Sequence, residues 1–265
     1  MQNELEILEA FLAIQVHTMF SAIESVNGFL VIHNDFDQTP YWNYALCTER
    51  PTEMHIRTIE KRMRTLQRKP AIYFPNTPSF HPLIEMLKHE WQLHNEDSWM
   101  FFEGTIPENL NVDQIKKVSS SVELEQWLTT LDASFLANDP QNPYGTLGTY
   151  IDLARRAWKE NNALGKFEYV IAFDRGEPVA VATLTYEGTL AYISNVGSRK
   201  DYRGKGYGKL VTLYCVLEAS RHAVSDICLA TEEGTYPNSF YKKIGFRTRF
   251  SACNYAKNDN SSSSY

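Results

Sequence analysis

The sequence predicts an α/β fold in which a mixed β-sheet is flanked by helices. Short β-branched and aromatic runs alternate with segments of helical periodicity along the 265 residues. A glycine-rich basic loop, residues 199–208, stands between one such strand and one such helix. A turn-rich stretch at residues 104–113 separates two sets of elements. We therefore expect two domains, residues 1–110 and 111–257.

The elements of the first domain follow from apolar spacing and helix-start signals. Leu5, Leu8 and Leu12 recur every three or four residues, which favours a helix. Thr52, with Glu53 in the next position, begins another helix that must end before Pro70. In order, we expect a helix over 5–25, strands over 28–33 and 42–47, a helix over 52–68, a strand over 71–74, a helix over 81–93 and a strand over 99–103.

The second domain is read in the same way. Asp174 to Pro178 supplies turn residues between two strand-like runs, which indicates a hairpin. We expect a strand over 117–122, helices over 123–136 and near 149–160, hairpin strands over 167–173 and 179–186, a strand over 189–196, a helix ending near 221, a strand over 226–231, a helix around Asn238 and a strand from 246. The chain from Lys257 onward is polar, and we expect residues 258–265 to be disordered.

The loop before the long helix has the features of a pyrophosphate cradle. Gly204, Gly206 and Gly208 let the backbone approach an anion, Arg203 and Lys205 add positive charge, and the helix N-terminus presents unpaired N–H groups. Spacing excludes the common alternatives. A Walker loop would need glycine at Arg203, and a dinucleotide fingerprint would need it at Lys209.

Two segments in this order resemble the GCN5-related N-acetyltransferase (GNAT) family. Asn195-Val-Gly-Ser-Arg-Lys-Asp-Tyr-Arg-Gly-Lys-Gly-Tyr-Gly208 resembles its acetyl-CoA motif, and Tyr236-Pro-Asn-Ser-Phe-Tyr-Lys-Lys-Ile-Gly-Phe246 resembles its asparagine-bearing helix. The resemblance covers roughly the last 150 residues, about one domain. It implies the acyl-CoA N-acyltransferase fold for residues 111–257.

The resemblance also implies roles for individual residues. The pantetheine arm of the coenzyme would pair with the strand at Val196, Gly197 and Ser198, where an amide near Val196 would polarise the thioester carbonyl. The pyrophosphate would bind the run Arg203, Gly204, Lys205, Gly206, Tyr207 and Gly208. Asn238 would contact the coenzyme's arm. Tyr241 would act as the general acid, since a phenol of pKa about 10 stays protonated and can donate to a thiolate of pKa about 8.5.

The general base stays open, because the strand over 189–196 carries no carboxylate. Glu187, Glu232, Glu233, Tyr192 acting through water, or solvent itself could accept the proton of the amine. The acceptor pocket would be formed by the loop over 137–150 and by the N-terminal domain.

The N-terminal part repeats the order of strand, helix, strand and helix, but its loop Thr48-Glu-Arg-Pro-Thr52 has no glycine and carries an acid. We expect either a degenerate GNAT-like copy without the coenzyme motif or an unrelated α/β cap. Its expected role is to wall the acceptor site or to form a homodimer.

Composition favours a cytoplasmic enzyme. No apolar run approaches the ~18 residues of a membrane span, and the four cysteines are scattered. The net charge of −6 argues against nucleic-acid binding and suits a cationic amine. His89 and His94 lie one residue too far apart for a zinc motif, so no metal is expected.

The sequence thus predicts an N-acetyltransferase that moves an acetyl group from acetyl-CoA to a primary amine of a small molecule or protein. Two alternatives remain: a non-catalytic coenzyme A sensor, and a tandem-domain transferase that uses another acyl donor.

Overall fold

The computed structural model describes residues 2–258, and the rest of the predicted tail, residues 259–265, lies outside this range. The chain divides into two compact units. Unit 1 contains Met100–Arg247, and unit 2 contains Gln2–Trp99 together with the described residues from Thr248 onward. The strands β5 (Trp91–Phe102) and β11 (Phe246–Lys257) each begin in one unit and end in the other. The division expected at residue 110 falls inside unit 1, in the loop between β5 and β6 (Ile115–Lys117).

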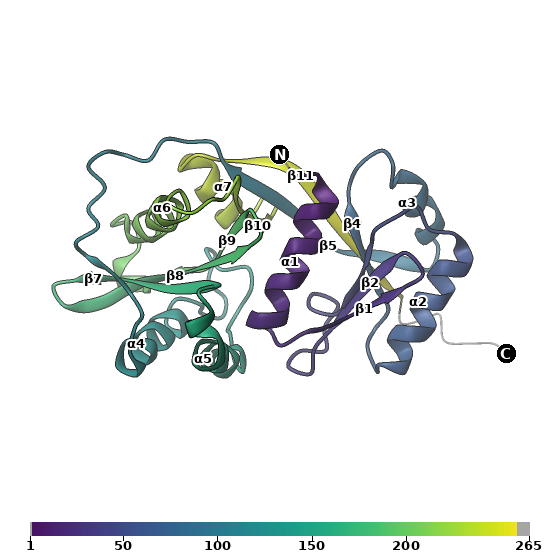
Figure 1. The fold of residues 1–265 in the computed structure, drawn as a ribbon, viewed down its shortest axis with the longest axis horizontal. Helices are drawn as coiled ribbons and strands as arrows, with labels where there is room; N and C mark the ends of the chain where they lie inside the picture. Colours follow the sequence, from purple (N-terminus) through teal and green to yellow (C-terminus); the bar gives the residue numbers. More distant parts are fainter. Residues whose placement is uncertain (1, 259–265) are drawn as a thin grey trace. The chain divides into compact units, whose positions relative to one another are not determined.

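Unit 1 is a sheet covered by helices on both faces. Its strands β6, β7 (Phe167–Asp174), β8 (Glu177–Glu187), β9 (Leu190–Ser198) and β10 (Asp226–Glu232) are neighbours in the order β10-β9-β8-β7-β6. The helices α6 (Tyr207–Ala219) and α7 (Tyr236–Lys243) lie on one face, and α4 (Ser121–Asp132) and α5 (Tyr150–Asn161) lie on the other (Figure 1). The strand expected over 117–122 was misplaced: β6 covers Ile115–Lys117 and shares only Lys117 with it. The Ser120 hydroxyl accepts the Glu123 amide, so α4 begins where the strand was expected to continue.

Unit 2 contains α1 (Glu4–Thr18), β1 (Ala22–Val26), β2 (Phe29–His33), β3 (Tyr44–Cys47), α2 (Glu53–Thr65), β4 (Ala71–Pro75), α3 (His81–Leu87) and most of β5 and β11. Its strand order is β1-β2-β3-β4-β11-β5. The prediction of a helix to residue 25 was wrong. Asn27 and Gly28 both have positive φ, so they form a tight turn that pairs β1 with β2.

Two further boundaries differ from the sequence prediction. The helix expected over 81–93 ends at Leu87, and β5 begins at Trp91. Lys257, which was placed with the polar tail, lies in β11 and is 6% exposed. Its ammonium group contacts the carboxylates of Glu60 at 3.0 Å and Glu90 at 2.6 Å, so the charge is paired where the strand buries it.

The two units repeat one order of elements, as the sequence predicted. In unit 2, β2 pairs antiparallel with β3, and β3 pairs parallel with β4 across α2. In unit 1, β8 pairs antiparallel with β9, and β9 pairs parallel with β10 across α6. Both units therefore have the strand–helix–strand arrangement of the predicted fold.

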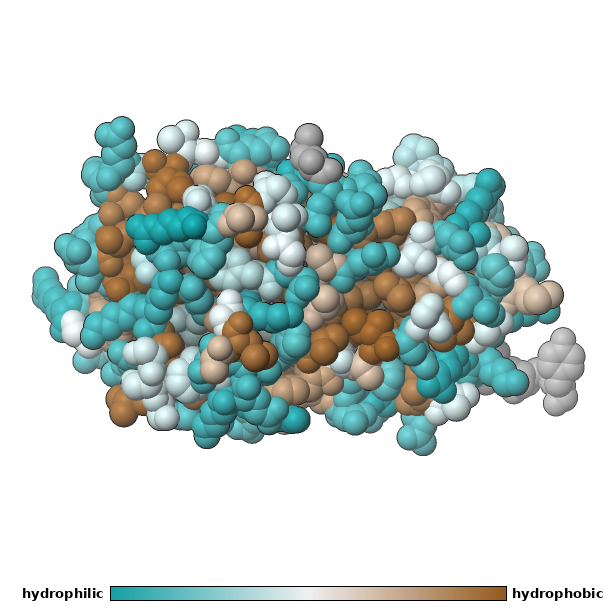
Figure 2. Space-filling view, viewed as in Figure 1, coloured by the Kyte–Doolittle hydropathy of each residue, from teal (hydrophilic) through white to brown (hydrophobic). Residues whose placement is uncertain are grey.

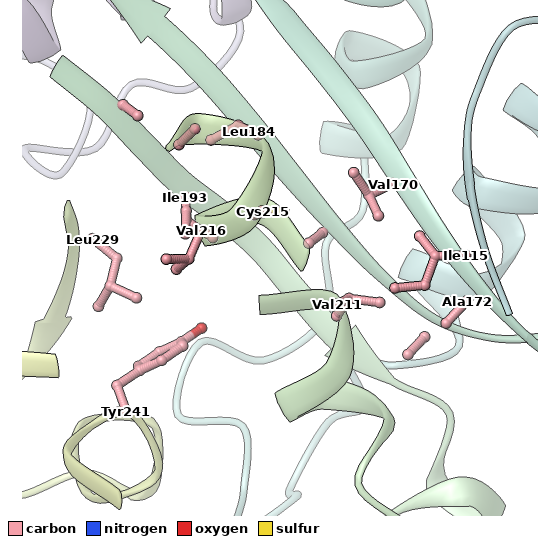
Figure 3. Packing of buried hydrophobic residues seen from close by; sticks show 14 of the residues in the cluster. Ile115, Val170, Ala172, Leu184, Ile193, Val211, Cys215, Val216, Leu229 and Tyr241 are labelled. Atoms are coloured by element: carbon pink, nitrogen blue, oxygen red, sulfur yellow. The ribbon is translucent and has the colours of Figure 1, made fainter. Parts of the chain in front are cut away.

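The core of unit 1 lies between the sheet and α6. Val211, Cys215 and Val216 of α6 pack on Ile193 and Leu229 of the sheet, and all five are at most 2% exposed. Figure 3 shows these side chains with Tyr241, which points toward them from α7. The chain's four cysteines are buried, and none of them is joined in a disulfide bond within residues 2–258.

The face drawn in Figure 2 carries hydrophilic side chains over most of its area, interrupted by groups of hydrophobic ones. No helix within residues 2–258 is long and apolar enough to cross a membrane.

Candidate active site

The strand β9 separates from β10 as it approaches the glycine-rich loop. The two strands pair at Leu190, Ala191 and Tyr192, which face Asp226, Ile227 and Cys228. Beyond this ladder, β9 runs on to Ser198 with no further pair to β10 in the described part of the chain. The backbone groups on this edge of β9 can therefore accept an added extended chain.

A β-bulge lies at the point where β9 leaves β10. In the β8–β9 ladder, Thr183 faces Ser194 and Val181 faces Gly197, so Asn195 and Val196 stand opposite Ala182 alone. The Ala182 carbonyl accepts the Trp127 indole N–H at 3.2 Å. Since a bulge turns backbone groups away from the regular ladder, it can aim an amide near Val196 out of the β8–β9 pairing.

Gly197 is needed for packing. A Cβ built on this residue would lie 2.6 Å from the Cβ of Ser134, which follows α4. Gly197 therefore allows β9 to approach the end of α4 closely, and a side chain there would push the two apart. The backbone of Gly197 can still lie beside the pantetheine arm as expected, because the close contact with Ser134 is on the side where a Cβ would stand.

The N-terminus of α6 presents uncapped amides. Gly206 is the N-cap residue and has no side chain to cap the helix. Within residues 2–258, the amides of Gly204 to Lys209 donate no recorded hydrogen bond, and the amide of Leu210 is the first to reach a carbonyl, that of Gly206 at 2.9 Å. Such a row of free donors at a helix N-terminus is typical of an anion-binding site.

Gly204 and Gly206 are required by the backbone of this loop. Their φ angles are +76° and +92°, which L-residues rarely adopt, and a Cβ built on either would meet no protein atom within 4 Å. The space beside them is therefore open. Gly208, in the first turn of α6, is closer to its neighbours, since its Cβ would lie 3.3 Å from Ser198 Oγ.

Arg203 is engaged within the protein. Its guanidinium donates to the carbonyls of Ser198 at 3.3 Å and Ser134 at 3.0 Å, and it forms an ion pair with Asp139. The Asp139 side chain is only 9% exposed in this pair. Although burial opposes it, hydrogen bonds from the Gln141 amide and from Arg203 hold the pKa of Asp139 below its usual value. Arg203 thus ties the glycine-rich loop to the segment after α4.

The remaining side chains of the loop lie toward its surface. The Lys205 ammonium group stands 4.6 Å from the centroid of the Tyr202 ring, and the Arg199 guanidinium stands 5.3 Å from it. Burial raises the pKa of Tyr207, and so does the Asp174 carboxylate, which is hydrogen-bonded to its phenol. Lys205 is exposed, so its charge is available beside the free amides.

Asn238 is 1% exposed, and the hydrogen bonds that its amide nitrogen donates fix the orientation of its side chain. Its Nδ2 donates to Thr231 Oγ1 at 3.1 Å and to Glu233 Oε2 at 3.2 Å, and it lies 3.5 Å from Met100 Sδ. No hydrogen bond to its Oδ1 is recorded within residues 2–258, so this oxygen is the acceptor that Asn238 can offer to a ligand.

Tyr241 is 9% exposed and projects from α7 into the core (Figure 3). Its ring packs edge-on against Phe240 and Phe246, with centroids 5.0 and 5.7 Å away. In the described chain its hydroxyl has no recorded hydrogen-bond partner. Burial raises the pKa of Tyr241 well above its usual value, with a further contribution from nearby Tyr144, so its phenol stays protonated.

Two of the acidic candidates for the base, Glu187 and Glu233, are paired with lysines. Glu187 pairs with Lys166 at 3.2 Å, at the end of β8 away from the glycine-rich loop. Glu233 pairs with Lys242 at 2.6 Å and accepts from Asn238. Glu232 ends β10, and Tyr192 lies on β9 and is 9% exposed. None of these contacts singles out one base.

The corresponding loop of unit 2 differs from the glycine-rich loop of unit 1. The Thr52 hydroxyl caps α2 by accepting the His55 amide, and the first turn of α2 carries Glu53. Glu49 folds over Gly28, where its carboxylate fills the space that a Cβ would need. The unit thus keeps the order of elements, but its loop has a capping hydroxyl and acidic side chains in place of the glycines of the unit 1 loop.

The structure also brings together residues that the sequence interpretation did not single out. Tyr150, the first residue of α5, contacts the Asn195 side chain, and Asp139 holds Arg203. These partners are 45 and 64 residues apart in the chain, so no local motif joins them. The Pro-, Asn- and Gly-rich composition of residues 137–150 was the available signal, and it marked a loop without identifying its contacts.

Solved structures with this architecture include acetyltransferases. The chain is similar to a GCN5-related N-acetyltransferase from Kribbella flavida, with a TM-score of 0.65, 15% identity and 94% of each chain covered. A functionally unknown conserved protein from Staphylococcus epidermidis gives a TM-score of 0.66 at 14% identity, over 89% of this chain and 94% of that one. A tandem GNAT protein from the clavulanic acid biosynthesis pathway gives 0.52 at 10% identity, over 96% and 95%. The fold is therefore that of GNAT acetyltransferases, in a tandem arrangement.

Comparison of the sequence with protein families gives a match for part of the chain. Residues 165–248 match the acetyltransferase (GNAT) domain family. No curated protein has a significant sequence match to the chain. The matched range contains β9, the glycine-rich loop, α6 and α7, and therefore every residue predicted to bind the coenzyme or to act as the acid.

Proposed function

We propose that unit 1 is an N-acetyltransferase that transfers the acetyl group of acetyl-CoA to a primary amine of a small molecule or a protein. The observation that carries the proposal is the row of unpaired amides from Gly204 to Lys209 at the N-terminus of α6. The short turn Lys200–Tyr202 connects the unpaired edge of β9 to this row, so one ligand with a phosphate group and an extended arm can use both features.

The coenzyme's pyrophosphate is assigned to the backbone of Gly204 to Gly208, with Lys205 adding positive charge. The pantetheine arm is assigned to β9 at Val196 to Ser198, where it would pair as an added strand. Asn238 offers Oδ1 to an amide N–H of the arm, because its Nδ2 is already engaged. Arg203 supports this site by holding the loop in place, since its donors bind the protein.

In the reaction, the amine nitrogen attacks the thioester carbonyl carbon, and the carbon–sulfur bond breaks to release a thiolate. An amide of the β9 bulge near Val196 would stabilise the negative charge that develops on the carbonyl oxygen. Tyr241 would donate to the departing sulfur. Burial makes its phenolate costly, so we expect a hydrogen bond to sulfur, or a transfer in which the phenol regains the proton that the amine releases.

The route of the amine's proton stays open. Glu187 and Glu233 are both paired with lysines, which favours solvent as the acceptor or an amine that arrives neutral. The loop that carries Tyr144 is proposed to line the acceptor site, because Tyr144 is close enough to influence the Tyr241 phenol.

For unit 2 we propose a part in acceptor recognition or in dimerisation, without a second coenzyme site. The capped N-terminus of α2 and the position of Glu49 support this assignment. We also propose a cytoplasmic location, where the four buried cysteines, which form no disulfide bond within residues 2–258, would stay reduced.

The test is to measure free-thiol release from acetyl-CoA with a panel of small amines and peptides, together with calorimetric titration of coenzyme A. Turnover with any amine supports the transferase. Coenzyme binding without turnover across the panel would favour the sensor, and absence of binding would refute the assignment of the cradle.

A further inference from the structure

The bulge in β9 depends on an unusual backbone conformation. Asn195 has a φ of +52°, the left-handed region, although it is not a glycine. This conformation is disfavoured for L-residues, and asparagine tolerates it better than most. Because Asn195 and Val196 stand opposite Ala182 alone, the conformation of Asn195 sets the direction in which the next amides of β9 point.

The Asn195 side chain is fixed by two other elements. Its Nδ2 donates to Thr183 Oγ1 on β8 at 3.0 Å. The hydroxyl of Tyr150 on α5 lies 2.9 Å from Nδ2 and 3.1 Å from Oδ1. Thr183 is 2% exposed, and burial raises the pKa of Tyr150, so the phenol remains a neutral partner of the amide. Strand, bulge and helix are thereby joined through one asparagine.

We propose that Tyr150 is a positioning residue for acetyl transfer. Through Asn195 it holds the left-handed bulge, and the bulge presents the β9 amide that polarises the thioester carbonyl. The inference rests on the proposed function. It adds that the orientation of this donor is set from α5, an element outside both coenzyme motifs. No pairing to β10 supports β9 at this point within the described residues, so the Tyr150–Asn195 contact takes that role.

Tyr150→Phe removes one oxygen and preserves the ring. Misplacing an oxyanion donor costs catalysis, and complete loss of such a donor lowers kcat about 10²–10³-fold. We expect a smaller fall, about 10-fold, because the amide is displaced but still present. The dissociation constant for acetyl-CoA should stay within about twofold, because the cradle is unchanged.

Two substitutions of Asn195 separate the loss of its side chain from the strain of its backbone. Asn195→Gly removes the side chain but adopts a positive φ without strain, whereas Asn195→Ala removes the side chain and retains the strain. We expect Asn195→Gly to keep a larger kcat than Asn195→Ala. In the Asn195→Gly background, Tyr150→Phe should have no further effect, because its partner is absent.

These measurements use the full chain, calorimetry with acetyl-CoA and the amine of the panel that gives the highest turnover. An undiminished 10-fold effect of Tyr150→Phe in the Asn195→Gly background would overturn the inference. So would a raised KM for the amine at unchanged kcat, which would make Tyr150 an acceptor-binding residue. If wild-type protein binds no acetyl-CoA, the proposed function fails and this inference fails with it. Normal binding and turnover with an unaffected Tyr150→Phe variant would refute the inference alone.

Discussion

Replacing Gly206 by alanine should have two effects that can be measured separately, a loss of coenzyme A affinity and a loss of folding stability. Gly206 has a φ of +92°, and a Cβ built there meets no protein atom within 4 Å. In the free protein the substitution therefore costs only the left-handed conformation, about 1–2 kcal/mol of stability. In the complex the methyl group occupies the space through which a phosphate would approach the amides.

The affinity loss can be estimated from the bonds at risk. A hydrogen bond to a charged group contributes about 1.5–3 kcal/mol, and each 1.4 kcal/mol is about tenfold in affinity. Losing one amide–phosphate bond should therefore weaken coenzyme A binding about 10- to 150-fold. Calorimetric titration measures this loss, and thermal unfolding measures the stability cost separately.

Gly188→Ala is the control. Gly188 has a φ of +55°, it also has no atom within 4 Å of a built Cβ, and it lies in the turn before β9, away from the glycine-rich loop. Its substitution should lower the melting temperature by a similar amount and leave coenzyme affinity unchanged. If the two variants bind coenzyme A equally well, the pyrophosphate does not bind at Gly206.

Other predictions test the side chains. Arg203→Lys and Asp139→Ala should both weaken coenzyme A binding, because each removes the contact between the loop and the segment after α4. Calorimetry measures this loss. An unchanged affinity in Asp139→Ala would mean that Arg203 acts by charge alone. Tyr241→Phe should lower kcat in the thiol-release assay toward the smaller end of the 10²–10⁴-fold range of general acids and leave coenzyme affinity intact, and a normal kcat would make Tyr241 a packing residue. Because the pKa of Tyr241 is raised, its protonated form persists to higher pH, so it should cause no alkaline loss of wild-type rate below about pH 10. Glu49→Arg should leave affinity unchanged, and titration should give one coenzyme per chain; two would contradict the assignment of unit 2.

The cradle could be predicted from sequence because its information is local. Glycine spacing, a strand before the loop and a helix after it all lie within residues 190–219, and the structure has each of them. The order of elements was equally accessible from apolar periodicity. The exception near Ala22 arose because Ile23 and Val26 continue the helical spacing of α1, while the Asn27-Gly28 turn that selects a strand lies just beyond.

The direction of a side chain could not be predicted in this way. Arg203 was assigned to the phosphate because its charge lies in the motif, yet its donors reach Ser134, Asp139 and Ser198. Sequence shows that a cation is present, and only tertiary contacts show which anion it faces. The same holds for Asn195, whose partner on α5 is remote in the chain.

Because β5 begins in unit 2 and ends in unit 1, a fragment that contains unit 1 alone must include the end of β5. Residues 100–110 precede the division expected from the sequence, but Met100 is 0% exposed in the core of unit 1, and Phe102 and Ile106 pack against that core. The Glu103 amide also donates to the Gly245 carbonyl at 3.0 Å. Met100 further lies beside Asn238, so the segment supports the proposed coenzyme site as well as the core.

A fragment beginning at Val112 should therefore fail to bind coenzyme A. Truncating one buried large side chain costs about 2–5 kcal/mol, and a domain has only about 5–15 kcal/mol of stability in total, so losing Met100 with Phe102 and Ile106 removes most of it. The matched fragment begins at Ser98 and differs only by the added segment. It should unfold at a higher temperature and should bind coenzyme A. Equal binding by the two fragments would show that residues 98–111 are dispensable and that the division near residue 110 describes the folding unit.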